Sequence, residues 1–188
     1  MKRNEVIIFP TDTLYAIGAR MDDLDGIDRI YELKDRDPKK KFVVLVHDVE
    51  DANKIAYLDD RALILIEKFL PGPLSIIVRT KPEYISRHIG STIGIRIPNH
   101  HLALQILKDY GPIANSSVNT SEEEPLNDYS EIYKRYHNKV DIIFPNYEHI
   151  SGLNSSIVDL TGKKPKMIRE GAITEKEILE ALGEKVED

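Results

Sequence analysis

The alternation of short apolar runs with segments of helical period constrains the fold more than any other feature of this sequence. Apolar runs of strand length occur at 6–9, 42–46, 74–78, 93–97, 140–144 and 156–160. Between them, apolar residues recur every three or four positions over 24–34, 49–57, 60–69, 101–110, 130–137 and 174–182. Short apolar runs favour buried strands, and the longer period favours amphipathic helices. The sequence therefore predicts helices packed on a largely buried sheet.

Composition narrows the class of protein. A chain of 188 residues is long enough for one sizeable core, and we expect a single domain over 1–188. The 26 Lys and Arg against 32 Asp and Glu give a net charge of -6, which opposes non-specific binding to nucleic acid or to an anionic membrane. There is no cysteine, which excludes disulfides and thiolate metal sites. Because the sequence shows no apolar leader and no membrane-length apolar run, we expect a cytoplasmic protein without membrane contact.

Seven segments at strand ends or in loops are richer in polar residues, Gly and Pro than a scaffold requires. They are PTDT (10–13), KDRDPKKKF (34–42), PGPLS (71–75), TIGIRIPNHH (92–101), NSSVNTSEEEP (115–125), NSSIVD (154–159) and IREGAI (168–173). Loops held by a rigid sheet are where binding and catalytic side chains concentrate. We therefore expect the functional site to be built from these segments.

Two of the segments carry cations whose positions need an explanation. Lys34, Arg36 and the lysines of 39–41 follow a predicted helix, where they would either complement the helix C-terminus or clamp a phosphate. Arg96 lies within an otherwise apolar strand, and a buried arginine must be paired or bound to a ligand. Arg96 is therefore the sharper indication of a site.

The hydroxyl-rich and amide-rich stretches 115–119 and 154–156 resemble each other, which favours their convergence. Such residues more often only form turns, and that reading stays open. The sequence has no P-loop and no dinucleotide fingerprint, so nucleotide phosphates would need side-chain cations. For Asp12 we expect a mainly structural role in its turn, and for His100 and His101 a helix-capping or surface role rather than metal ligation. No metal site of the protein is predicted.

Taken in order, the seven segments resemble the motifs of the YrdC-like threonylcarbamoyl-AMP synthases, in their single-domain form. Family members look like PTDT-x-YGLG, K-x-R before a strand, PGPLT, T-x-x-x-R-x-P-x-H, S-A-N with a following Pro, ST-x-VD and a late Arg-x-Gly, and the resemblance covers nearly the whole chain. It implies an α+β, three-layer fold with a highly twisted mixed β-sheet, flanking helices and an open concave site.

The resemblance also implies a reaction. L-threonine, bicarbonate or CO2, and ATP would give L-threonylcarbamoyl-adenylate and pyrophosphate, which makes the protein a nucleotidyltransferase. ATP is then a substrate, with Mg2+ on its triphosphate. The product would pass to a tRNA threonylcarbamoyl transferase complex for threonylcarbamoyladenosine modification of tRNA, and a weak contact with tRNA is among the implied interactions.

Site residues carry over from the family motifs position by position. The resemblance places threonine at Thr13, Arg96, Ser117 and Ser155. It places ATP at Arg36, Lys40, Thr92, Asn119, Asn127 and Arg169. Lys34 and Arg36, the K-x-R pair, are the implied catalytic residues. In this picture PTDT ends a strand with its hydroxyls toward substrate, and residues 15–18 turn the chain back into the core.

The sequence departs from the family pattern at several positions. Ala16 stands where Gly is usual, Lys41 where Pro is common and Leu45 where many members have His, and Glu122 to Glu124 replace a Ser-Gly stretch. These changes leave open a non-catalytic RNA-binding or regulatory protein of the same fold. Against RNA binding stand the net charge of -6 and the absence of tryptophan, with tyrosines scattered among helices. Against a scaffold stand the retained cations, which a scaffold does not need.

Overall fold

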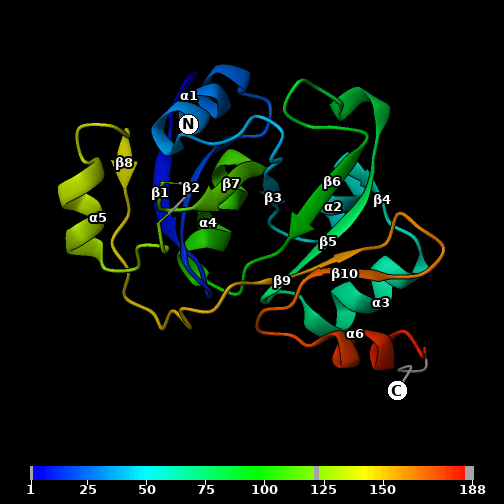
Figure 1. Cartoon of the computed structure of the whole chain (residues 1–188). Coiled ribbons are helices and arrows are strands. Elements are labelled where there is room, and N and C mark those ends of the chain that lie inside the picture. Colours follow the sequence, from blue (N-terminus) through cyan, green and yellow to red (C-terminus); the bar gives the residue numbers. More distant parts are fainter. Residues whose placement is uncertain (1, 121–122, 185–188) are drawn as a thin grey trace.

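A mixed β-sheet forms the centre of the computed structural model, which describes residues 2–120 and 123–184 (Figure 1). Its strands are β1 (Ile7–Pro10), β2 (Tyr15–Arg20), β3 (Val43–Leu45), β4 (Ala56–Tyr57), β5 (Leu74–Thr80), β6 (Thr92–Arg96), β7 (Ile113–Ser117), β8 (Ile142–Ile143), β9 (Ser156–Asp159) and β10 (Lys166–Arg169). Their order is β10-β9-β5-β6-β3-β7-β2-β1-β8, with β4 paired to β5. The pairs β1/β8, β3/β6 and β5/β9 are parallel and the others antiparallel. The expected mixed sheet flanked by helices is confirmed.

The helices begin where aspartate, histidine or threonine side chains cap them. They are α1 (Leu24–Lys34), α2 (Val49–Ile55), α3 (Asp60–Phe69), α4 (His101–Tyr110), α5 (Tyr129–Tyr136) and α6 (Glu175–Ala181), with a short 3-10 turn at Pro82–Tyr84. The caps are Asp23, Asp48, Asp59, His100, Asp128 and Thr174, each accepting a hydrogen bond from a backbone N-H of the first turn. Such bonds satisfy donors that the helix leaves unpaired. The capping role expected for His100 is confirmed.

Four strands, β2, β4, β7 and β10, were not predicted, and β4 lies inside the segment 49–57 that was expected to be helical. Tyr15–Arg20 does not simply turn back but forms β2, antiparallel to β1 with Phe9 opposite Ala16. The turn that joins the two strands is confined to the threonines and Asp12, where Thr11 N-H donates to the Leu14 carbonyl oxygen. β7 is polar over most of its length, yet β2 and β3 pair with it on both sides. Pairing on both sides outweighs the weak strand propensity of Asn and Ser.

One face of the sheet carries the larger core. On β5, Leu74, Ile76 and Val78 alternate toward this face and are buried. Helices α1, α2, α3 and α6 contribute buried residues to the same cluster, among them Ile30 and Leu65. The alternation is the one expected of a strand with unlike faces. Within the described ranges, no helix combines the length and the apolar character that crossing a bilayer would require.

The opposite face is divided into two halves. In the first, called the covered half here, side chains of β1, β2, β3 and β7 pack against α4 through its buried Ala103, Ile106 and Leu107. The sheet residues of the covered half are Ile7, Phe9, Ala16, Leu45 and Ile113. In the second, the open half, Ile77 on β5, Gly94 on β6 and Ile157 on β9 stay only half-buried. The open half carries a concave pocket.

Candidate active site

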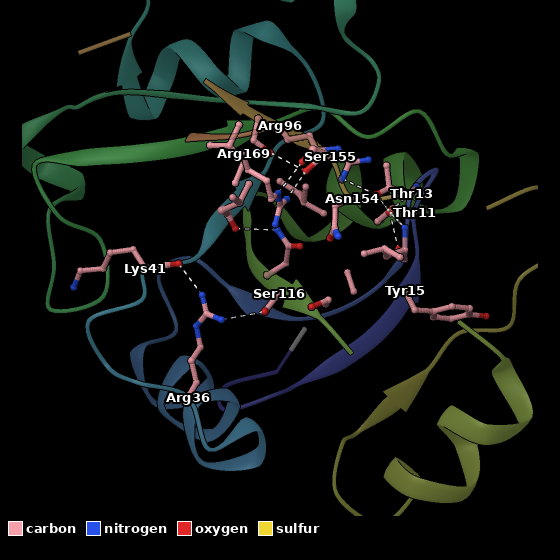
Figure 2. A pocket seen from close by; sticks show the side chains of 18 residues that line it. Thr11, Thr13, Tyr15, Arg36, Lys41, Arg96, Ser116, Asn154, Ser155 and Arg169 are labelled. Atoms are coloured by element: carbon pink, nitrogen blue, oxygen red, sulfur yellow. Dashed lines mark hydrogen bonds between the residues drawn. The ribbon is translucent and has the colours of Figure 1, made fainter. Parts of the chain in front are cut away.

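The pocket lies where the expected segments meet, between the PTDT turn, the basic segment after α1, the end of β7 and the start of β9 (Figure 2). Six of the residues singled out in the sequence line it: Thr13, Arg36, Arg96, Ser117, Ser155 and Arg169. They are distant in the chain, and the sheet brings them together because β6, β3 and β7 are neighbours while β9 and β10 follow β5.

Arg96 occupies a fixed position at the end of β6. It is 6 % exposed. Its Nε donates to the Gly72 carbonyl oxygen at 3.0 Å, its Nη1 to Thr13 Oγ1 at 2.8 Å and its Nη2 to Asp12 Oδ1 at 2.6 Å. Burial lowers the pKa of Arg96, and the Asp12 carboxylate opposes that shift. Each terminal nitrogen keeps a second N-H, so the planar fork can still donate to a ligand anion.

Asp12 combines the structural role expected for it with a role at the site. Besides the ion pair with Arg96, Asp12 Oδ1 accepts from the backbone N-H of Asn99 at 3.0 Å. The backbone oxygens of Asp12 and Thr13 accept from Ser151 and Gly152 N-H at 3.0 and 2.9 Å. Asp12 therefore orients Arg96 and joins the PTDT turn to two other loops.

The hydroxyl hydrogens of the PTDT turn are already committed. Thr11 Oγ1 donates to the Leu14 carbonyl oxygen at 2.7 Å and lies 3.1 Å from Thr13 Oγ1. Because Thr11 has a single hydroxyl hydrogen, Thr13 must be the donor in that second contact. Thr13 Oγ1 then faces the pocket with acceptor capacity only. A ligand group beside it must be a donor, such as an ammonium.

A second hydroxyl pair lies where β9 begins. Ser155 Oγ lies 3.4 Å from Ser75 Oγ and accepts from Arg169 Nη2 at 3.2 Å. Arg169 Nε donates to the Ser155 carbonyl oxygen at 3.0 Å. Burial lowers the pKa of Arg169, and its charge also lowers that of Arg96. The two guanidinium groups are thus close enough to act on one ligand.

Arg36 lies across the pocket from Arg96 and Arg169 (Figure 2). Its Nε and Nη2 donate to the carbonyl oxygens of Lys40 and Lys41, both at 3.0 Å, and its guanidinium stacks over the Phe42 ring at 4.8 Å. Nη1 makes a long contact of 3.5 Å with Ser116 Oγ. The guanidinium is therefore held at the rim with N-H groups toward the pocket.

Lys34 points away from the pocket, although it is only two residues before Arg36. It is 2 % exposed, and its Nζ donates to the Ser117 carbonyl oxygen, the Asn119 carbonyl oxygen and Asn119 Oδ1 at 2.6, 2.5 and 2.7 Å. Burial, and then the charge of Arg36, lower the pKa of Lys34 to about 7. Helix α1 ends between the two residues, at Asp35 with φ of 48°, and that left-handed residue directs the pair to opposite sides.

Four other residues expected at the ATP site lie outside the pocket lining. Asn119 is buried against Lys34, and Asn127 Oδ1 accepts from the backbone N-H of Tyr15 at 3.0 Å. Lys40 is exposed in the basic segment, and Thr92 is exposed at the start of β6. Thr92 shares the open half with Gly94 and Arg96, since alternate residues of a strand face the same way. A ligand extending from Arg96 along β6 would reach it.

Departures from the family pattern lie within the pocket or next to it. Ala16, Lys41 and Leu45 all line it. Leu45 pairs in register with Arg96 and gives the pocket an aliphatic boundary with the covered half. Of the acidic stretch, Glu122 lies outside the described residues, and the Glu123 carboxylate pairs with Arg135 of α5 at 3.3 Å. The charge of Glu123 is thus held by α5.

Several pocket residues were not picked out individually from the sequence. They are Thr11, Ser75, Asn115, Ser116 and Asn154. All lie in segments that had been singled out, so the segment composition was the available signal. Which atoms face inward depends on strand register, and the sequence does not specify register by itself.

The charges of the lining define what can bind. Arg36, Lys41, Arg96 and Arg169 are cations, and the lining contains no carboxylate among the residues described. In the same part of the chain, no three His, Asp or Glu side chains come close enough together to hold a metal ion. The pocket can therefore bind a ligand with more than one anionic group, with hydroxyl oxygens available for a cationic or N-H group.

Comparison with known proteins gives a consistent family. A family model described as telomere recombination, named for Sua5, YciO and YrdC, matches residues 1–171. The threonylcarbamoyl-AMP synthase of Bacillus subtilis is 28% identical over 188 residues, covering 97% of this chain and 54% of that protein. The putative threonylcarbamoyl-AMP synthase of Methanocaldococcus jannaschii is 33% identical over 169 residues, covering 90% and 81%.

A solved structure agrees with these relatives. Sua5 of Pyrococcus abyssi complexed with L-threonine superposes with a TM-score of 0.90 at 28% identity, covering 96% of this chain and 54% of that one. The chain thus spans about half the length of the Bacillus protein and of the Pyrococcus protein.

Proposed function

The chain belongs to the Sua5, YciO and YrdC family, and from that premise we propose that it synthesises L-threonylcarbamoyl-adenylate from L-threonine, bicarbonate or CO2, and ATP. The observation that carries the proposal is one cavity with two cationic sides. Arg96 and Arg169 lie on one side with hydroxyl oxygens between them, and Arg36 lies on the other.

The side with Arg96 fits an α-amino acid. Its remaining N-H groups suit a carboxylate, while Thr13 and Ser155 offer hydroxyl oxygens within the same wall. Thr13 can only accept from the ligand, which selects an ammonium or another donor. The aliphatic boundary at Leu45 suits a methyl group. Threonine has each of these groups.

The side with Arg36 fits the phosphates of ATP. Arg36 offers a bidentate fork and Lys41 a mobile point charge at the same rim, and these suit phosphate oxygens. Arg169, on the side of Arg96, lines the same cavity, so in the proposal it neutralises charge at the α-phosphate. Exposed Lys40 and Thr92 border this side. In the proposal they remain outer contacts of the nucleotide.

The chemistry requires little acid-base catalysis from the protein. The threonine amine combines with CO2, or with bicarbonate with loss of water, to give a carbamate. A carbamate oxygen then attacks the α-phosphorus, the bond to the β-phosphate oxygen breaks and pyrophosphate leaves. Positioning and charge neutralisation dominate such a transfer. A pocket with fixed arginines and no catalytic triad suits that requirement.

Magnesium is proposed to enter with the nucleotide. The pocket lining, as far as the structure describes it, offers hydroxyl and amide oxygens but no carboxylate, which is the donor set of an ion carried by triphosphate rather than by a protein cage. When bound, Mg2+ would neutralise phosphate charge. No residue of this chain is assigned to it beyond that.

The test is pyrophosphate release from ATP and bicarbonate by the purified protein, measured with and without L-threonine. We expect release that depends on both threonine and bicarbonate, with serine as the control amino acid. Release that is indifferent to threonine, or that does not occur while ATP still binds, would contradict the proposal. Detection of threonylcarbamoyl-adenylate by mass spectrometry would identify the product, which is proposed to pass to a tRNA threonylcarbamoyl transferase.

A non-catalytic RNA-binding role is the second candidate, favoured by one surface. On α5, Tyr129, Tyr133 and His137 form a row with ring centroids 6.0 and 5.2 Å apart. Tyr133 is 50% exposed, and exposed rings in a row can stack on unpaired bases. Retention of a single-stranded RNA probe that Tyr133→Ala abolishes would support this role.

A further inference from the structure

A buried group of polar residues lies directly behind the pocket wall formed by β7. Lys34 Nζ, the Ser117 carbonyl oxygen and both oxygens of Asn119 meet there, and Asn119 Nδ2 donates to the Glu123 carbonyl oxygen at 2.6 Å. Lys34 and Asn119 are 2 % and 9 % exposed. We call this group the β7 knot.

In the β7 knot, the hydrogens of the Lys34 ammonium are all bonded to oxygens of the protein. An ammonium has three hydrogens, and three oxygens accept from Lys34 within 2.7 Å. Asn119 Oδ1 also accepts from Ser117 Oγ at 2.8 Å. Each hydrogen of the Lys34 ammonium therefore has an acceptor in the 117–119 segment, and a phosphate or carbamate oxygen would have to displace one of them.

The knot fixes the residues that do face the ligand. Ser117 Oγ is directed by its bond to Asn119, so its remaining capacity toward the pocket is as an acceptor. Ser116 precedes it and contacts Arg36 across the rim. The pairing of β7 with β3 ends at Asn115, so at Ser116 and Ser117 only β2 pairs with the strand. The Lys34 ammonium adds a second support there, at the Ser117 carbonyl oxygen.

We propose that Lys34 is a positioning residue that fixes Ser116 and Ser117 at the pocket wall through Asn119, rather than a group that contacts the substrates. The two residues of the K-x-R pair thus have different roles. Arg36 faces the ligand, and Lys34 holds the wall against which the ligand lies. The inference depends on the proposed function only for the identity of the ligand.

A double-mutant cycle separates this role from direct contact. Lys34→Met, Asn119→Leu and the double variant are compared for binding of a non-hydrolysable ATP analogue and for threonine-dependent pyrophosphate release. We expect each single change to lower affinity or kcat/KM by about 10- to 100-fold, and the double variant to stay within about threefold of the worse single one. Lys108→Met is the control, because Lys108 is an exposed lysine of α4 and lies outside the pocket lining.

The opposite result has a distinct form. If Lys34 touches the nucleotide, Lys34→Met lowers affinity by the same factor whether or not Asn119 is present, and the losses multiply. That outcome would overturn the inference. Because the ATP analogue does not turn over, its binding reports on Lys34 even if threonine-dependent release fails and the proposed function falls.

A measurement on the unmodified protein removes any dependence on how the variants fold. With 15N-lysine labelling, the Lys34 ammonium should give a signal with protected hydrogens, and its shift should not change when inorganic tripolyphosphate is added. Exposed lysines give averaged signals and serve as internal controls. If the Lys34 signal shifts when tripolyphosphate is added, and returns to its original position when salt is added, Lys34 contacts the phosphate directly. That result would refute the positioning role.

Discussion

The covered and open halves of the sheet's second face use the same strands for opposite purposes. On β3, Leu45 packs in the covered half against α4, while Val43, two residues earlier, lines the pocket. In the covered half a helix fills the concavity with Ala103, Ile106 and Leu107, which are almost fully buried. In the open half the same twist leaves a hollow bordered by cations. On this face of the sheet, the helix packing therefore lies beside the site, and the strands of the site are left uncovered.

Removing packing from the covered half tests whether the two halves are independent. Leu107→Ala deletes a fully buried side chain and should lower the free energy of unfolding by about 2 to 5 kcal/mol, because a cavity is left under α4. Urea denaturation measures it. The affinities for threonine and for the ATP analogue should change less than threefold, when they are measured at a temperature where the variant stays folded. A larger change would mean that the two halves are coupled.

A change in the open half should do the reverse. Arg96→Gln removes the charge but keeps an amide that can reach Asp12, and we expect kcat/KM for threonine to fall by about 100-fold, because charge-assisted hydrogen bonds contribute roughly 1.5 to 3 kcal/mol. Arg20→Gln is the matched control, since Arg20 also pairs with an aspartate, Asp22, and lies outside the pocket lining. Equal losses in the two variants would refute the assignment of Arg96.

The β7 knot, which lies behind the pocket wall, can be tested with pH. Burial lowers the pKa of Lys34 to about 7, while in the unfolded chain it keeps its ordinary value near 10.5. Between these values the unfolded state binds more protons, so Lys34 should make the free energy of unfolding rise with pH by up to about 1.4 kcal/mol per unit. Arg36 is the charged neighbour and does not titrate in this range.

Comparing wild type with Lys34→Met between pH 7 and 9 isolates this contribution. The slope should be smaller in the variant. In the same range the wild-type amine loses one of its three hydrogens, so affinity for the ATP analogue should decline as pH rises, and Lys34→Met should lack that decline. If the pH profiles of the two proteins are parallel, Lys34 does not cause the pH dependence, and the prediction is wrong.

Sequence reasoning found the elements that depend on local pattern. The limits of α1, α3 and α4 were predicted as the structure has them, since strong periods and capping side chains mark helix ends. Strands with apolar runs, such as β5 and β6, were also found. By contrast β2, β4, β7 and β10 were missed, and in β7 and β10 the reason is that residues facing the pocket replace apolar ones. Strands that line a site therefore resemble loops.

The sequence identified the segments that form the site, but not the direction in which each side chain points. The seven polar segments do supply the pocket, yet only the backbone shows that Lys34 turns inward and Arg36 outward around Asp35. Likewise Asp12 was assigned to its turn, whereas its ion pair with Arg96 requires β6 to end beside that turn. Such contacts depend on register and on helix termination, which are tertiary properties.

The order of the strands has a consequence for how the protein is made. One part of the pocket comes from the PTDT turn near residue 12, and another part comes from Ser155 and Arg169, which enter the sheet only when β9 pairs with β5 and β10 with β9. A nascent chain leaving the ribosome can form α1 early, but it lacks this second part of the pocket until residue 169 has been synthesised. Binding competence should therefore appear late and in one step, so that unfinished chains do not sequester substrate.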